Sequence, residues 1–160
     1  MDIFEYALQM EKDGEDYYHE IADKTGNRGL KDVMNMLADE EKNHFRAIKG
    51  MKEKLYSLAQ TNIVEDVKNV FVRMRQSGEV FEPGESEVEM FRKAQEIETE
   101  SRDFYDEKSK EVEDGDQKRL LERLASEEQK HYNMLENIID FVCKPNRWLE
   151  NAEWYHLDEY

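Results

Sequence analysis

The sequence of 160 residues contains little cysteine, proline or glycine, and each scarcity excludes a class of protein. Its single cysteine, Cys143, excludes an internal disulfide framework and leaves no Cys-x-x-Cys pair for a rubredoxin or zinc module. With only two prolines and seven glycines, long stretches of the chain run without a helix breaker. Together with the 39% of charged residues, this composition predicts a mostly helical protein.

Positive charge is also scarce, because the formal net charge is −16. Nucleic-acid backbones and anionic membranes both require a basic surface, so we expect neither as a partner. No apolar run reaches membrane-spanning length, and the first residues have neither the basic start nor the apolar stretch of a signal peptide. We therefore expect a cytoplasmic protein. The acidic surface suits the collection of cations, although most acidic residues are expected only to form a solvated face.

Hydrophobic periodicity predicts an all-α domain made of two helical hairpins joined by a long crossover. An internal repeat supports this arrangement, since the segment around Phe4 and Ala7 recurs 87 residues later around Phe91 and Ala94. Two such hairpins build a four-helix bundle, which we place at residues 1–143. The helices are expected at 2–25, 29–58, 85–113 and from the break at Asp114-Gly115 to Cys143, with a shorter helix at 64–75 inside the crossover at 60–84.

Two of the expected helices carry a glutamate and a histidine in the seam where apolar residues belong. A buried carboxylate costs several kcal/mol unless it is paired, protonated or bound to a metal. Because this happens twice in the same register, the pattern predicts a metal site inside the bundle. The first seam is Met34, Leu37, Glu41, His44, Ile48, Met51 and Leu55, and the second is Leu121, Leu124, Glu128, His131, Leu135, Ile138 and Val142.

The hairpin geometry adds two further glutamates to this prediction. Glu11 and Glu98 lie on apolar seams of the other two long helices, and folding each hairpin at its midpoint brings Glu11 level with Glu41 and Glu98 level with Glu128. Four carboxylates would balance two divalent ions, and mixed oxygen and imidazole ligation suits iron, with manganese as the alternative. A further Glu-x-x-His in the tail, Glu153 and His156, has no repeat partner, and we expect no role for it.

On these residues the chain resembles the ferritin-like di-iron carboxylate superfamily, and within it the rubrerythrin-like proteins without a rubredoxin domain. The resemblance implies a ferritin-like four-helix bundle in which Glu41 and Glu128 bridge two irons. It also implies Glu11 and Glu98 as terminal carboxylate ligands, with His44 and His131 as the nitrogen ligands. Such sites cycle between di-ferrous and di-ferric states and reduce hydrogen peroxide or oxygen, with electrons here supplied by a separate donor such as a rubredoxin-type protein.

Four neighbouring residues are candidates for a role beside the metals. Tyr18 and Tyr105 fall two turns from Glu11 and Glu98 on the same helix faces, within reach of the ligands. Rubrerythrins carry an extra glutamate where this chain has Ser101, and the equivalent position in the first half is Gly14. These small residues would either leave space for a diatomic ligand or relieve crowding between helices.

Two other functions remain open at this point. The bundle would serve as a ferritin-type iron-binding or storage protein if it assembled into a closed shell, or as an interaction module if it kept its ligands without using them. The aromatic tail at 144–160, which contains Trp148 and Trp154, is expected to pack on the bundle or on a second subunit. It favours a discrete homodimer over a cage.

Overall fold

The computed structural model describes residues 2–78 and 85–144, and this part of the chain consists of helices joined by short turns and one long connection. Five helices follow one another in the described residues, and no strand occurs among them. They are α1 (Ile3–Lys24), α2 (Arg28–Lys52), α3 (Ile63–Ser77), α4 (Glu85–Glu111) and α5 (Gly115–Cys143). The all-α prediction is therefore confirmed. The expected aromatic tail lies outside the described residues, as does the Glu153 and His156 pair.

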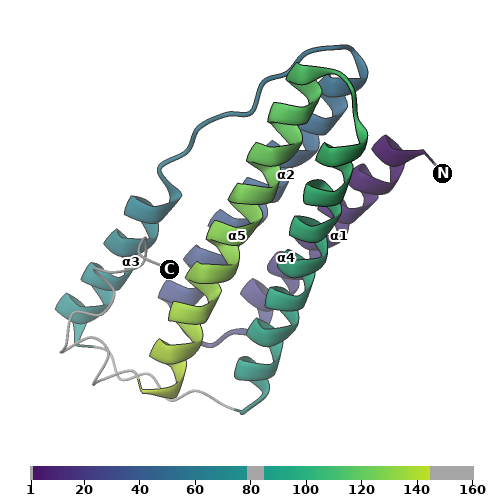
Figure 1. The fold of residues 1–160 in the computed structure, drawn as a ribbon. Helices are drawn as coiled ribbons and strands as arrows, with labels where there is room; N and C mark the ends of the chain where they lie inside the picture. The colour runs from purple at the N-terminus through teal and green to yellow at the C-terminus, as the bar shows by residue number, and fades with distance from the viewer. Residues whose placement is uncertain (1, 79–84, 145–160) are drawn as a thin grey trace.

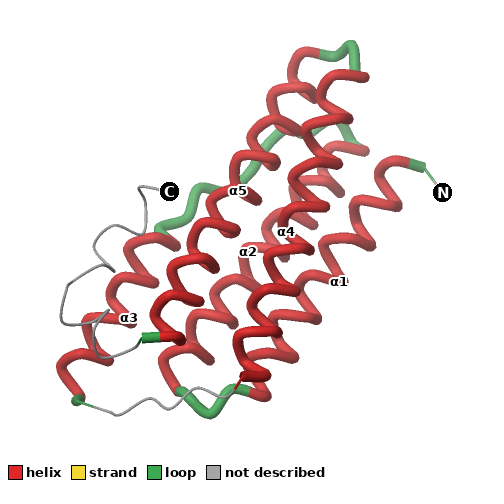
Figure 2. The backbone as a smooth tube through the Cα atoms, turned by 60° about the horizontal axis from the view of Figure 1, so that its bottom comes forward, coloured by secondary structure: helices red, strands yellow, loops and turns green. Residues whose placement is uncertain are grey.

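The long helices form two hairpins that pack side by side (Figure 1). Helix α1 packs along α2, and α4 packs along α5, while α1 meets α4 and α2 meets α5 across the bundle. Helix α3 lies in the crossover and packs against α2. Figure 2 shows the connection after α2 running back along the bundle before α3 begins. The predicted bundle with a short crossover helix is therefore what the structure contains.

Most of these helices begin after a residue whose side chain caps the helix N-terminus. The Asp2 side chain accepts a hydrogen bond from the backbone N–H of Glu5, at 2.8 Å, and Asn27 does the same for Leu30 at the start of α2. Asp114 caps α5 by accepting from the N–H groups of the two residues after Gly115. Each cap satisfies backbone donors that have no partner inside the helix.

The second helix ends earlier than its periodicity predicts. It stops at Lys52 instead of Leu58, because the chain turns through Lys54, whose φ of 61° is left-handed. Leu55, expected in the seam, is therefore 59% exposed, whereas Leu58 returns to the core. The fourth helix also ends two residues before the expected Glu113.

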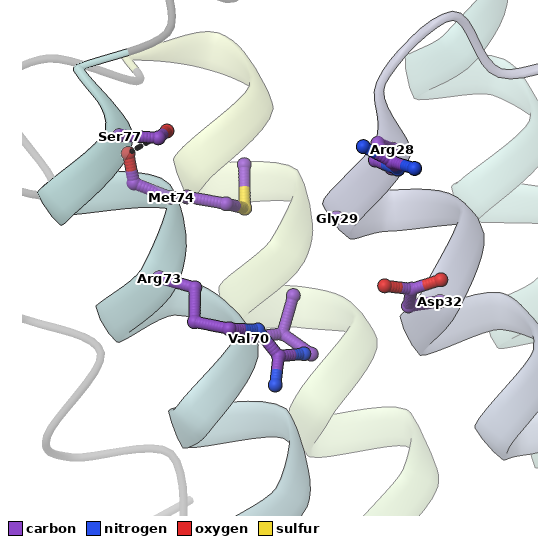
Figure 3. A pocket seen from close by; sticks show the side chains of 7 residues that line it. All are labelled: Arg28, Gly29, Asp32, Val70, Arg73, Met74 and Ser77. Atoms are coloured by element: carbon purple, nitrogen blue, oxygen red, sulfur yellow. Dashed lines mark hydrogen bonds between the residues drawn. The ribbon is translucent and has the colours of Figure 1, made fainter.

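Glycine at position 29 allows α3 to approach the start of α2. A Cβ atom there would lie 2.5 Å from the Met74 sulfur, which is closer than real side chains approach. Figure 3 shows Met74 pointing from α3 toward this glycine, at one side of a surface hollow that Arg28 and Arg73 also line. Both charged and apolar side chains line this hollow, which lies between α3 and the start of α2.

The apolar core is divided into two clusters by a polar layer. One cluster holds Ala38 and Met134 and reaches to α3, and the other holds Ala47 and Leu124 and reaches to the α4–α5 turn. Along α2 the residues between Ala38 and Ala47 include Glu41 and His44, and the other long helices carry polar groups at the corresponding level. The expected ligands occupy this layer.

Candidate metal centre

The structure brings all six expected ligand residues together in the polar layer. They form two overlapping groups whose oxygen and nitrogen atoms lie within 4.8 Å of one another. Each of these residues is at most 2% exposed. The two groups are Glu11, Glu41, His44 and Glu128, and Glu41, Glu98, Glu128 and His131. Glu41 and Glu128 belong to both groups, which is the position that a bridging carboxylate requires.

Both histidines direct Nδ1 toward the carboxylates. His44 Nδ1 lies 2.8 Å from Glu128 Oε1 and 3.5 Å from Glu11 Oε1. His131 Nδ1 lies 3.6 Å from the nearest oxygens of both Glu41 and Glu98. The imidazole rings are nearly parallel, with centroids 5.5 Å apart and an interplanar angle of 7°. Each histidine therefore faces one group of carboxylates through the same ring nitrogen.

Two tyrosines complete the layer, and they cross between the hairpins. Tyr18 donates its hydroxyl to Glu98, and Tyr105 donates to Glu11. Both tyrosines are almost fully buried. The sequence placed each tyrosine beside the glutamate of its own helix, whereas the hydrogen bonds reach the glutamate of the opposite helix. A phenol hydrogen bond to a carboxylate fixes the orientation of that carboxylate.

Gly14 and Ser101 lie in the same layer, and the structure shows what Gly14 makes room for. A Cβ atom at position 14 would lie 3.1 Å from Glu41 Oε2 and 3.4 Å from its carboxyl carbon. The space at Gly14 is thus taken by the Glu41 carboxylate, which favours the relief of crowding over a vacant ligand position. Ser101 is buried at 3% exposure.

The four carboxylates divide into two electrostatic classes. Burial, reinforced by the charge of the neighbouring glutamates, raises the pKa of Glu41 and Glu128 well above the usual range. Burial alone would also raise the pKa of Glu11 and Glu98, but hydrogen bonds from neighbouring carboxyl groups and the nearby histidines outweigh it. The pKa of Glu11 is lowered, and that of Glu98 is lowered to about 2. Without metal, the arrangement therefore favours the protonated form of the two central carboxyls and the ionised form of the two outer ones.

A metal fits this arrangement because the ligand atoms lack other partners. Each of the four glutamates has one buried oxygen with no hydrogen-bond partner, and Nδ1 of His131, which faces them, also has none. An unsatisfied buried polar group costs about 1–3 kcal/mol, and so many at one place are rare in folded proteins. Two divalent ions would satisfy these atoms and balance four carboxylate charges. Carboxylate and imidazole donors suit iron or manganese.

Glu40 and Glu127 lie beside the histidines and are not among the residues predicted for the site. Both join His44 and His131 in a third group of candidate ligand atoms within 4.8 Å of one another. The signal for them is present in the sequence, since each directly precedes a central glutamate and the pair recurs in the repeat. The prediction missed them because they fall just outside the apolar seam.

Comparison with known proteins gives one family. A model of the rubrerythrin family matches residues 2–139, which is most of the chain and includes all six expected ligands. No curated protein and no solved structure gives a significant match.

Proposed function

This chain belongs to the rubrerythrin family, and from that premise we propose that it is a di-iron oxidoreductase that reduces hydrogen peroxide or oxygen. The observation that supports this most is the pair of overlapping ligand groups, because two groups that share two carboxylates suit a dinuclear centre. Iron in this centre would supply the electrons that break the O–O bond. We further propose that a separate donor, such as a rubredoxin-type protein, returns these electrons, since the chain has no Cys-x-x-Cys pair.

The residues of the chain have three tasks in this function. The six ligand residues would hold the two metals between two apolar clusters, which exclude bulk water. Tyr18 and Tyr105 keep the terminal carboxylates oriented through their hydroxyl groups. Glu41 and Glu128 give up their protons when metal binds, because a carboxylate must be ionised to be a ligand. Reduction of peroxide to two waters consumes two electrons and two protons.

The proposal is tested by metal content and peroxide turnover. Purified protein is reconstituted with ferrous ion without oxygen, alongside Glu41→Gln and Glu128→Gln variants. Glu122→Gln, at an exposed position of α5, is the matched control. We expect about two irons per chain in the wild type and the control, with stoichiometry and peroxide consumption both lost in the two variants. Unchanged iron content in both variants would refute the site.

Iron storage is distinguished from catalysis in the same samples. A storage protein would take up iron well beyond two ions per chain and would elute as a closed shell of many subunits. We propose instead a discrete homodimer that keeps about two irons per chain during turnover. Iron that is bound without any peroxide or oxygen reduction would contradict the oxidoreductase proposal.

A further inference from the structure

The third group of candidate metal ligands includes the same two histidines. It consists of Glu40, His44, Glu127 and His131, and we name it the outer cluster. Its ligand atoms lie within 4.8 Å of one another. The outer cluster shares both histidines with that centre but uses two different glutamates.

The free ring nitrogens of the histidines are the independent sign of a ligand. In both rings Nδ1 faces the carboxylates of the candidate centre. Nε2 of both rings is buried and has no hydrogen-bond partner, and His131 Nε2 lies 3.9 Å from Glu40 Oε2. Two buried imidazole nitrogens without partners are costly unless something binds them.

The two carboxylates of the outer cluster differ in burial: Glu40 is buried and held by a hydrogen bond, whereas solvent reaches Glu127. Glu40 is 5% exposed, and the hydroxyl of Thr61 in the α2–α3 connection donates to one of its oxygens, which leaves the other toward His131. The Glu127 side chain is 20% exposed, with Lys130 Nζ at 3.3 Å. A cation can therefore arrive at Glu127 and be held between Glu127 and the buried Glu40.

We propose that the outer cluster binds one zinc-like divalent cation through both Nε2 atoms, and that this cation excludes metal from the candidate centre. Two carboxylates and two imidazoles are a tetrahedral zinc donor set whose charges cancel the ion. A neutral imidazole has one lone pair and one N–H. When Nε2 ligates, Nδ1 carries the proton, and in His44 Nδ1 lies 2.8 Å from Glu128 Oε1, within reach to donate it. Each neutral histidine can therefore ligate a metal in the outer cluster through Nε2 or a metal in the candidate centre through Nδ1, but not both at once.

Binding is tested with cobalt(II), a coloured substitute for zinc, in protein whose candidate centre is blocked. The Glu41→Gln/Glu128→Gln double variant removes both bridging carboxylates, and Glu11→Gln/Glu98→Gln is the second blocked protein should the first fail to fold. We expect about one cobalt per chain with the intense visible absorption of four-coordinate ions, displaced by zinc. Adding Glu40→Gln or Glu127→Gln should weaken binding by about 10-fold or more, and adding the exposed Glu122→Gln should not. Folded, blocked protein that binds no cobalt would overturn the proposal.

Exclusion is tested in protein with an intact centre, and this part rests on the proposed function. One equivalent of zinc added before ferrous ion should reduce iron uptake, and the Glu40→Gln/Glu127→Gln variant should restore the uptake seen without zinc. Equal iron uptake with and without zinc, in protein that has bound both, would overturn the exclusion. The two proposals fail separately, because the cobalt result in blocked protein does not depend on iron binding.

Discussion

The metal-free protein should lose stability as the pH rises through the neutral range. Its cause is the protons held by Glu41 and Glu128, whose pKa values are raised by burial well above those of the unfolded chain. A group whose pKa is higher in the folded protein binds more protons in that state, so its stabilising contribution is present at low pH and disappears as the pH rises through the folded pKa. The pKa of His131 is also raised, because the charge of Glu98 outweighs the effect of its burial, and it acts in the same direction.

The magnitude follows from the number of protons. Each proton bound only by the folded state reduces the free energy of unfolding by about 1.4 kcal/mol per pH unit, so two carboxyls give up to about 2.7 kcal/mol per unit below their folded pKa. A domain is typically stable by about 5–15 kcal/mol, so this loss is large. The low pKa of Glu98, about 2, and the lowered pKa of Glu11 have the opposite sign, but their effect is complete above about pH 5.

Urea unfolding in the presence of a chelator, followed by far-ultraviolet circular dichroism at about pH 6, 7 and 8, measures this slope. The Glu41→Gln/Glu128→Gln variant keeps the shape of the protonated carboxyls without the proton, so its slope should shrink to what His131 contributes. Saturating metal should reverse the trend, because metal displaces the protons and binds more tightly at higher pH. A wild-type slope near zero, or an equal slope in the double variant, would refute the reasoning.

Three substitutions test other parts of the structure by the free energy of unfolding. Gly29→Ala should destabilise the fold by about 1–3 kcal/mol despite the helix propensity of alanine, because the new methyl group would meet the Met74 sulfur at 2.5 Å. Tyr105→Phe should cost metal-free protein about 1.5–3 kcal/mol, since Glu11 loses a buried charged hydrogen bond, and a cost below about 0.5 kcal/mol would contradict that bond. Leu55→Ala should change the free energy of unfolding by less than about 0.5 kcal/mol, because Leu55 is exposed. A loss as large as that of a buried leucine would contradict this placement and show that Leu55 packs in the core.

The helices and the level of the candidate centre could be predicted because both depend on periodicity and chain length. Glu11 and Glu41 lie at about equal distances on either side of the turn between their helices, and the same spacing recurs in the second half of the chain. This was enough to place these groups at one level of the bundle. The end of α2 could not be predicted in this way. Residues 53–58 contain no glycine or proline, and the left-handed conformation of Lys54 has no signal in its residue type.

The contacts between the two hairpins could not be predicted from the sequence for a different reason. Periodicity tells which face of a helix is buried but not which residue of another helix meets it. Tyr18 was therefore placed near Glu11 of its own helix, whereas its hydroxyl reaches Glu98 across the bundle. Glu40 likewise has the sequence position of a solvated residue. It is buried where Thr61 of the crossover reaches it, a contact that no helical pattern encodes.

The repeat itself explains why the crossed contacts come in pairs and where the symmetry fails. The numbers of Glu11 and Glu98 differ by 87, and the same offset converts the hydrogen bond from Tyr18 to Glu98 into that from Tyr105 to Glu11. The centre is thus nearly two-fold symmetric.

Two departures from this symmetry lie beside the ligands. Gly14 lets the Glu41 carboxylate approach α1 to a distance at which a Cβ atom would be crowded, whereas its counterpart, Ser101, carries a buried side chain. Glu40 is held by Thr61, whereas its counterpart, Glu127, meets the ammonium group of Lys130 near solvent. Because both departures act on ligands or their immediate neighbours, the two halves of the centre are chemically unequal, and two metals bound there would differ in affinity and in spectrum.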